Sequence, residues 1–255
     1  MIALSGGREG IVKVGDIVMR PANVWTPTIH QYLEYLHNHQ VGFVPKPISL
    51  QGGVEQVSYV KGEVCNYPLN VEFTAESTLV SAAKLLRKLH DVSASFLTQL
   101  SGNEIWMLPA IEPQEVICHA DYAPYNVTVK NAQTIGIIDF DTCHPGSRIW
   151  DIAYAIYRWA PLNRVGAADS FGTQQQQFVR AKIFLNAYGF SRAARAEVVA
   201  TLVIRLQTMV AYIIRQAANG DKAFIANIDD GHHIHYRKDI EYIEANASLI
   251  TAAIS

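Results

Sequence analysis

The chain has 255 residues, of which 49% are hydrophobic and 17% charged, a composition that excludes a disordered tail or a disulfide-stapled miniprotein and predicts a folded core. Its 21 Lys and Arg residues against 23 Asp and Glu residues give a formal net charge of -2, without the positive excess that feeds binding to nucleic acid, so we expect no nucleic-acid partner. Three widely spaced cysteines, Cys65, Cys118 and Cys143, favour reduced thiols in a cytoplasmic protein over a secreted disulfide framework.

The first half of the chain alternates β-like runs with helical patterns. Its N-terminus has no basic segment followed by a long apolar run, so no secretory signal is predicted. A hairpin is predicted over residues 10–20 around Gly15-Asp16, because Gly-Asp supplies the positive φ angles of tight turns. Apolar residues at helical spacing predict helices over 26–40 and 74–90, and residues 54–60 are strand-like.

The second half is predicted to begin with short strands and to continue as helices. The strand-like runs are 115–118, 127–130 and 135–140, and the helical ones are 150–159, 174–188, 192–218 and 236–252. The most apolar run, residues 198–214, contains Arg205 and Gln207 and is shorter than the roughly 20 residues of a membrane span, so no membrane partner is expected. The whole pattern predicts an α+β fold in which a small β-rich lobe precedes a larger, mainly helical lobe.

A polar cluster follows two of these predicted strands. The first strand leads into a loop with His119, Asp121 and Asn126, and a later strand ends at Asp139-Phe140-Asp141. Phosphoryl transfer needs a carboxylate to accept the proton of the attacking hydroxyl, and hard oxygen ligands to hold Mg²⁺ against nucleotide phosphates. An Asp followed after four residues by an Asn, with a further Asp on a later segment, is the arrangement of a kinase catalytic loop.

With these motifs the chain resembles the aminoglycoside phosphotransferase and choline kinase group, small-molecule kinases with a protein-kinase-like, two-lobed fold. The segments Asp139-Phe140-Asp141 and Trp150-Asp151-Ile152-Ala153 are similar to motifs of that group. The resemblance covers nearly the whole chain, and residues 117–153 are its most specific part. It implies an ATP-dependent phosphotransferase that uses Mg²⁺ and acts on a hydroxyl of a small molecule, such as an aminoglycoside or a related amino alcohol or sugar.

The resemblance also assigns roles to single residues of this sequence. It makes Asp121 the catalytic base, Asn126 and Asp139 the Mg²⁺ ligands, and His119 and Asp151 supports of the catalytic loop. Two readings of Asp141 stay open: contact with a second metal through water, or a cap of the following loop. The predicted lobes are residues 1–61, which cover the nucleotide, and residues 62–255, which carry the catalytic and metal-binding loops.

Within the predicted small lobe, Gly6 and Gly7 would form a glycine-rich phosphate cover, because glycines let backbone N–H groups approach phosphate oxygens. Arg20 stands where kinases keep a phosphate-binding lysine, and its bidentate fork differs in geometry from an ammonium. Glu34 on the next helix is the best candidate for the carboxylate partner of Arg20, and the alternative interpretation is an ordinary solvent-facing glutamate. The backbone from Ser58 to Val60, in the linker between the lobes, would receive the purine edge.

Two other functions use the same residues. A glycoside hydrolase would employ Asp121 and Asp139 as its paired carboxylates, but this leaves Asn126 and the glycines without a role. A nucleotide-binding protein without turnover is favoured by Arg20 and by the short segment before the glycines. The acceptor, the choice between ATP and GTP, any role in antibiotic resistance and the oligomeric state are not determined by the sequence.

Overall fold

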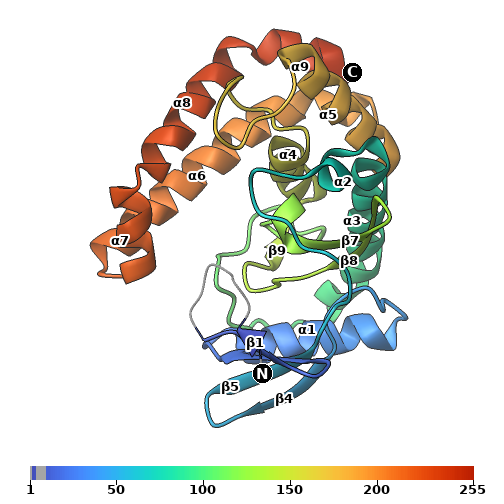
Figure 1. Ribbon diagram of the computed structural model, residues 1–255, viewed down its shortest axis with the longest axis vertical. Helices are drawn as coiled ribbons and strands as arrows, with labels where there is room; N and C mark the ends of the chain where they lie inside the picture. Colours follow the sequence, from blue (N-terminus) through green and yellow to red (C-terminus); the bar gives the residue numbers. More distant parts are fainter. Residues whose placement is uncertain (1, 4–9) are drawn as a thin grey trace. The chain divides into compact units, whose positions relative to one another are not determined.

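The computed structural model describes residues 2–3 and 10–255 (Figure 1). The chain divides into two compact units, Met1–Arg148 and Ile149–Ser255. The first unit holds the large β-sheet, and the second consists of helices. The predicted α+β class, with β-structure first and helices after it, is therefore confirmed.

The sheet of the first unit has five antiparallel strands in the order β1-β2-β3-β5-β4. The predicted hairpin is present as β2 and β3, with Gly15 at φ 61° in the turn, a left-handed backbone that glycine adopts at little cost. Residues 47–51 form an additional strand that the sequence analysis did not predict. The strand bounds are β1 Ile2–Ala3, β2 Val12–Val14, β3 Ile17–Pro21, β4 Pro47–Gln51 and β5 Val54–Ser58.

Helix α1, Thr26–Asn38, follows β3 and carries one apolar face. Pro27 occupies the first turn, where its missing N–H costs nothing. Ile29, Tyr32, Leu33 and Leu36 recur three to four residues apart and are buried, as their spacing predicts. This face anchors α1 in the first unit and fixes which residues the helix presents to the sheet.

The rest of the first unit builds the platform for the polar loops. Helix α3, Glu76–Phe96, buries Leu79, Ala82, Leu86 and Leu89 and packs against β6 and β8, one strand from each of two small antiparallel pairs. The first pair is β6 Val116–Cys118 with β9 His144–Gly146, and the second is β7 Val127–Lys130 with β8 Gln133–Ile137. The remaining elements are α2 Val71–Thr74 and the 3-10 helices η1 Leu97–Gln99 and η2 Pro124–Asn126.

The second unit is helical (Figure 1). In α4 every residue from Trp150 to Trp159 is buried. The predicted final helix is interrupted at Asn246 and forms two helices in the structure. The short helix α7 was not predicted from the sequence. The helices are α4 Arg148–Trp159, α5 Gln174–Tyr188, η3 Ala193–Glu197, α6 Val198–Ala218, α7 Lys222–Asp229, α8 His232–Ala245 and α9 Ala247–Ile254.

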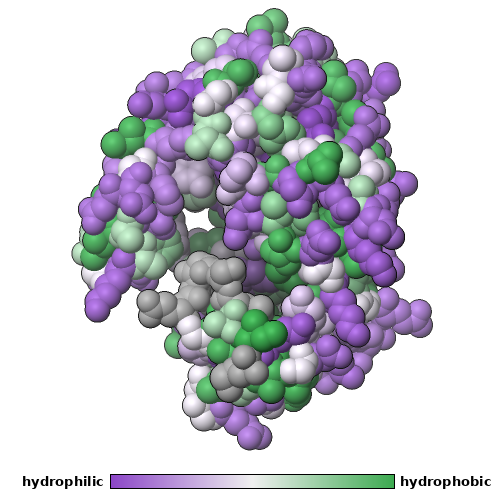
Figure 2. All heavy atoms as spheres, in the orientation of Figure 1, coloured by the Kyte–Doolittle hydropathy of each residue, from purple (hydrophilic) through white to green (hydrophobic). Residues whose placement is uncertain are grey.

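One helical segment of the described chain, Ala193–Ala218, is long and apolar enough by length and composition to cross a membrane. It extends beyond the apolar run recognised in the sequence. The core helix of a folded protein passes the same test; in this segment 39% of the apolar window is buried, and Leu202, Leu206 and Val210 are among its buried residues. Figure 2 shows hydrophobic side chains scattered among hydrophilic ones on the visible face, as is ordinary for a folded protein.

Candidate active site

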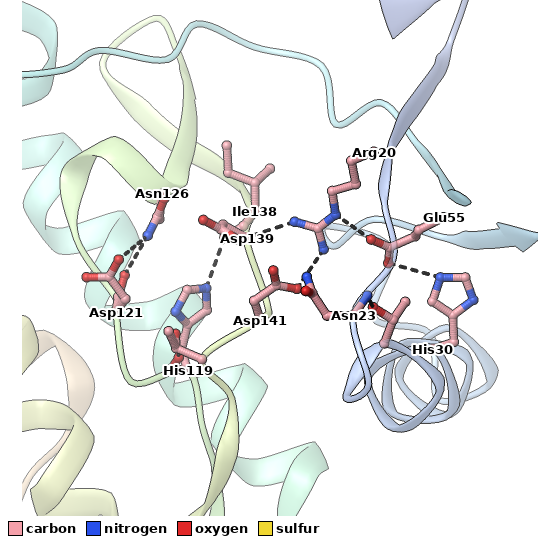
Figure 3. Close-up of polar contacts among 12 residues, drawn as sticks. Arg20, Asn23, His30, Glu55, His119, Asp121, Asn126, Ile138, Asp139 and Asp141 are labelled. Atoms are coloured by element: carbon pink, nitrogen blue, oxygen red, sulfur yellow. Dashed lines mark hydrogen bonds and ion pairs between the residues drawn. The ribbon is translucent and has the colours of Figure 1, made fainter. Parts of the chain in front are cut away.

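The loop after β6 carries Asp121, whose carboxylate accepts hydrogen bonds on both oxygens (Figure 3). Asn126 Nδ2 donates to Asp121 Oδ2 at 2.8 Å and to the Asp121 main-chain oxygen at 3.0 Å. The Tyr125 hydroxyl donates to Asp121 Oδ1 at 2.8 Å. The loop itself turns through Ala120 at φ 66°, an uncommon backbone for alanine that is held where the surrounding structure fixes it. The candidate base is therefore held in one orientation.

His119 lies beneath this loop and is fully buried. Its Nε2 is 3.0 Å from the carbonyl oxygen of Ile138, the residue before Asp139. The ring meets those of Tyr122 and Phe140 edge-on, with centroids 5.8 and 5.2 Å away. Because it is buried and bound to the backbone, His119 is placed to support the two loops rather than to touch a substrate.

Asp139 is brought to the catalytic loop by backbone hydrogen bonding. The Ile138 N–H donates to the Asn126 carbonyl at 2.9 Å, and Asp139 itself has φ 61°, so a second left-handed residue occurs at this site. The loop of residues 119–126 and the segment that carries Asp139 therefore lie next to each other (Figure 3).

The oxygens gathered there suit a hard divalent cation. The Asp139 side chain is half exposed, at 51%, and in the described part of the chain Asn126 Oδ1 accepts no hydrogen bond while its Nδ2 serves Asp121. Carboxylate and amide oxygens are the ligands that Mg²⁺ takes, usually few of them, with phosphate and water completing the shell. Among the described residues there is no cluster of three or more His, Cys, Asp or Glu side chains that could hold a metal ion.

Arg20 of β3 reaches the same region from the sheet (Figure 3). Its Nε donates to the carboxylate of Glu55, its partner in the β3–β5 register. Its Nη2 donates to Asp141 Oδ1 at 2.8 Å, and its Nη1 lies 3.4 Å from Asp139 Oδ1. One guanidinium therefore joins the sheet to the segment that carries both aspartates.

The charges around Arg20 shift the pKa values of the pair. Burial alone would lower the pKa of Arg20, but the negative charges of Asp141 and Glu55 outweigh burial and raise that pKa above its ordinary value. Burial alone would likewise raise the pKa of Glu55, but the hydrogen bond with His30 and the charge of Arg20 bring it below its ordinary value. Both side chains are charged at neutral pH.

Of the two interpretations of Glu34, the structure supports the solvent-facing glutamate, and Arg20 pairs with Glu55. Glu34 is exposed on α1, whereas the Glu55 side chain is only 1% exposed and holds Arg20. What α1 contributes instead is His30, whose Nε2 lies 3.0 Å from Glu55 Oε1. The helix is thus coupled to the arginine through a glutamate on the neighbouring strand, and not by a carboxylate of its own.

The predicted purine-binding backbone is partly occupied. The Ser58 N–H donates to the Lys46 carbonyl, and the Tyr59 N–H donates to the Asp16 carbonyl, both at 2.8 Å. Contacts of Ser58 with a nucleotide would therefore have to use its carbonyl or side chain, while Val60 is half-buried and lies beyond the end of β5. The role of both residues stays a prediction.

The structure says less about the predicted glycines and about Asp151. Gly6 and Gly7 lie outside the described residues. Asp151 is fully buried in the first turn of α4, where a carboxylate complements the positive end of the helix dipole. Its role as a support of the catalytic loop stays a prediction.

Sequence reasoning missed Tyr125, His30 and Glu55. A signal for Glu55 existed: it alternates with Val57 in a strand, so both point to the same, buried face. Charged side chains are rarely buried unless they are paired, so a glutamate in this pattern requires a partner. Tyr125 and His30 carried no comparable signal.

Comparisons with known proteins agree with the fold and the motifs. Residues 98–193 match the model of the phosphotransferase enzyme family. A trifolitoxin immunity protein of Rhizobium leguminosarum bv. trifolii is 26% identical over 207 residues, 78% of this chain and 77% of that protein.

Two solved structures share the fold. A choline/ethanolamine kinase family protein from Mesorhizobium loti aligns with a TM-score of 0.59 at 17% identity, over 96% of this chain and 88% of the other. A spectinomycin phosphotransferase in complex with ADP and spectinomycin aligns with a TM-score of 0.59 at 11% identity, over 98% and 92%. The predicted protein-kinase-like fold is confirmed by these structures, and the resemblance to phosphotransferases is confirmed by the family match over residues 98–193.

Proposed function

We propose that this chain transfers the γ-phosphate of ATP to a hydroxyl of a small molecule, with Mg²⁺ at the site. The observation that carries the proposal is that the loop with Asp121 and Asn126 and the segment with Asp139 are joined by hydrogen bonds through Ile138. A glycoside hydrolase would need only two carboxylates and would give no role to Asn126 or to the arginine that reaches Asp139. The phosphotransferase gives each of these residues a role.

In the proposed reaction Asp121 orients the acceptor hydroxyl and accepts its proton. The hydroxyl oxygen forms a bond to the γ-phosphorus, the bond from that phosphorus to the β–γ bridging oxygen breaks, and ADP leaves. Asn126 and Asp139 would hold Mg²⁺, which neutralises phosphate charge when bound. Asp121 performs its step from a carboxylate that Tyr125 and Asn126 already orient.

The nucleotide is proposed to lie between the sheet of residues 1–61 and the loops of residues 62–148. Arg20 would offer its guanidinium to phosphate oxygens, and Gly6 and Gly7 would cover them. The carbonyl of Ser58 and the backbone of Val60 would meet the purine. Competition of ATP with GTP in a binding assay tests this part, since the two purines present different edges.

The acceptor is proposed to be an aminoglycoside or a related amino alcohol or sugar. A second candidate follows from the relative that is 26% identical over 78% of this chain and is described as a trifolitoxin immunity protein. On that reading the chain protects its host from a toxic molecule, by phosphorylating it. Both candidates use the same site and are proposed to act in the cytoplasm.

The proposal is tested by ADP release with Mg²⁺, ATP and a panel of amines, amino alcohols, sugars and aminoglycosides. Acceptor-dependent ADP release that is lost in Asp121→Asn supports it. A thermal shift with MgATP but no ADP release under any acceptor would establish a nucleotide-binding protein without turnover. Sugar hydrolysis in the absence of nucleotide would establish the glycosidase.

A further inference from the structure

We propose that Arg20 is a built-in counter-cation of Asp141 that takes the place of a second divalent ion, so that the site holds a single divalent ion, at Asn126 and Asp139. The inference rests on the proposed function, in which phosphate oxygens of a bound nucleotide complete the coordination shell of that ion. It closes the question left open by the sequence, whether Asp141 contacts a metal.

The contact between Arg20 and Asp141 is short and sheltered. Nη2 lies 2.8 Å from Asp141 Oδ1, and the two side chains are 12% and 3% exposed. A buried carboxylate is costly unless a cation and hydrogen bonds compensate its charge. Arg20 supplies both, because its planar fork delivers a charge and a directed N–H to the same oxygen.

Asp139 differs from Asp141 in each of these respects. Its side chain is 51% exposed, and its distance to Arg20 Nη1 is 3.4 Å, at the weak end of a hydrogen bond. Asp139 can therefore bind a metal without losing a strong partner. Asp141 is less available to a metal, because its Oδ1 already accepts a hydrogen bond from Arg20 at 2.8 Å and its side chain is only 3% exposed.

Arg20 is itself fixed in this position. Its Nε is held by Glu55, which His30 holds in turn (Figure 3), and the strand register sets Arg20 opposite Glu55. Each nitrogen of the guanidinium thus faces a different carboxylate. Turning the group to admit a second cation would break contacts to all of them, and a fixed positive charge repels a divalent ion at the same place.

Arginine is the residue suited to this task. A lysine ammonium is a point charge, whereas the guanidinium presents several N–H donors in a fixed plane. The planar fork contacts Glu55 on one side and the two aspartates on the other, while the positive charge that repels a second cation is common to arginine and lysine. Arginine in place of the expected lysine would therefore mean that the negative charge of Asp141 is neutralised by a side chain and not by a divalent ion.

The test counts bound Mn²⁺, read from the electron paramagnetic resonance signal of free Mn²⁺, with the full chain and saturating AMP-PNP. We expect a single ion per chain in the wild type and in Arg20→Lys, and a second, weaker ion in Arg20→Gln, where Asp141 loses its counter-cation. In the double variant Arg20→Gln, Asp141→Asn the second ion should disappear again. Thermal unfolding of each variant establishes that it is folded.

Two ions in the wild type would overturn the inference, as would a single ion in a folded Arg20→Gln. The wild-type count decides the matter even if the variants fail to fold. No binding of AMP-PNP, seen as no thermal shift, would overturn the nucleotide assignment and this inference together. Binding of AMP-PNP with two ions would overturn this inference alone and leave the phosphotransferase proposal standing.

Discussion

Arg20 and Glu55 face each other across the neighbouring strands β3 and β5, and the Arg20 guanidinium donates from Nε to the Glu55 carboxylate. The strand register therefore places a buried ion pair beside the candidate active site. His30 on α1 holds the other Glu55 oxygen at 3.0 Å. The Arg20–Glu55 pair thus connects the sheet to helix α1 through His30 and to the segment that carries Asp139 and Asp141 through Arg20.

Breaking the pair should destabilise the first unit. Glu55→Ala leaves Arg20, whose side chain is 12% exposed, without one of its carboxylates, and we expect a loss of about 3 kcal/mol in the free energy of unfolding. Urea denaturation measures it. The matched control is Arg87→Ala, which removes an exposed pair with Asp91 on α3 and should cost less than about 1 kcal/mol. Equal effects of the two variants would contradict the structural role given to Glu55.

The same pair should set the acid limb of stability. The pKa of Glu55 in the folded chain lies below its ordinary value of 4.5, because His30 and Arg20 outweigh the effect of burial. The unfolded chain therefore takes up the proton first as the pH falls. The stabilisation is fully present above pH 4.5 and is lost as the pH falls through the lower pKa of the folded state.

Glu55→Gln tests this sign. The difference in unfolding free energy between wild type and Glu55→Gln should be largest above pH 4.5 and should shrink at lower pH. Urea denaturation across this range gives the difference. A difference that grows on acidification would mean that the folded state does not depress the pKa of Glu55.

Tyr125→Phe should slow turnover with little loss of stability. The hydroxyl that donates to Asp121 Oδ1 at 2.8 Å would be gone, while the bond from Asn126 to Asp121 Oδ2 would remain. We expect kcat to fall about tenfold, equivalent to about 1.4 kcal/mol, with KM for ATP unchanged. Tyr242→Phe, which removes a hydroxyl bonded to Gln174 in the helical unit, is the control and should leave kcat as it is. An unchanged kcat in Tyr125→Phe would remove the positioning role.

Gly136→Ala should disturb the backbone proposed to meet the purine. A Cβ at this position would overlap Val60 Cγ1 and would lie 2.5 Å from Thr128 Oγ1. We expect a loss of about 2 kcal/mol in unfolding free energy, the range of overpacked cores, and a higher KM for ATP. Gly42→Ala, with nothing within 4 Å of the added Cβ, should change neither. A stable Gly136→Ala variant with an unchanged KM for ATP would contradict the proposed role of Val60 in nucleotide binding.

The sequence predicted those parts of the molecule that depend on local pattern. The β2–β3 hairpin, the buried face of α1 and the order of strands before helices follow from turn residues and periodicity, and the structure contains them. The resemblance to kinases also implies that the loop with Asp121 and Asn126 lies near the segment with Asp139, while the roles of these residues stay predictions. Backbone bonds such as Ile138 to Asn126 realise this proximity.

What the sequence did not predict depends on contacts between distant residues. Glu34 was chosen as the partner of Arg20 by its place on the next helix, yet strand pairing brought Glu55, 35 positions away, against Arg20 instead. Strand β4 begins at Pro47, a residue that weakens a strand pattern, and only its pairing with β5 makes it a strand. Register and pairing are properties of the folded chain and leave little trace in a local window.

The central claim is that Asp121 accepts the proton of an acceptor hydroxyl beside a nucleotide held at Asn126 and Asp139. The most direct measurement is ADP release by wild type, Asp121→Asn and Asp139→Asn with MgATP and the best acceptor of the panel, alongside MgATP binding by each. The account predicts that Asp121→Asn loses more than about a hundredfold in kcat while it still binds MgATP, and that Asp139→Asn loses both. Turnover by Asp121→Asn at the wild-type rate would contradict it.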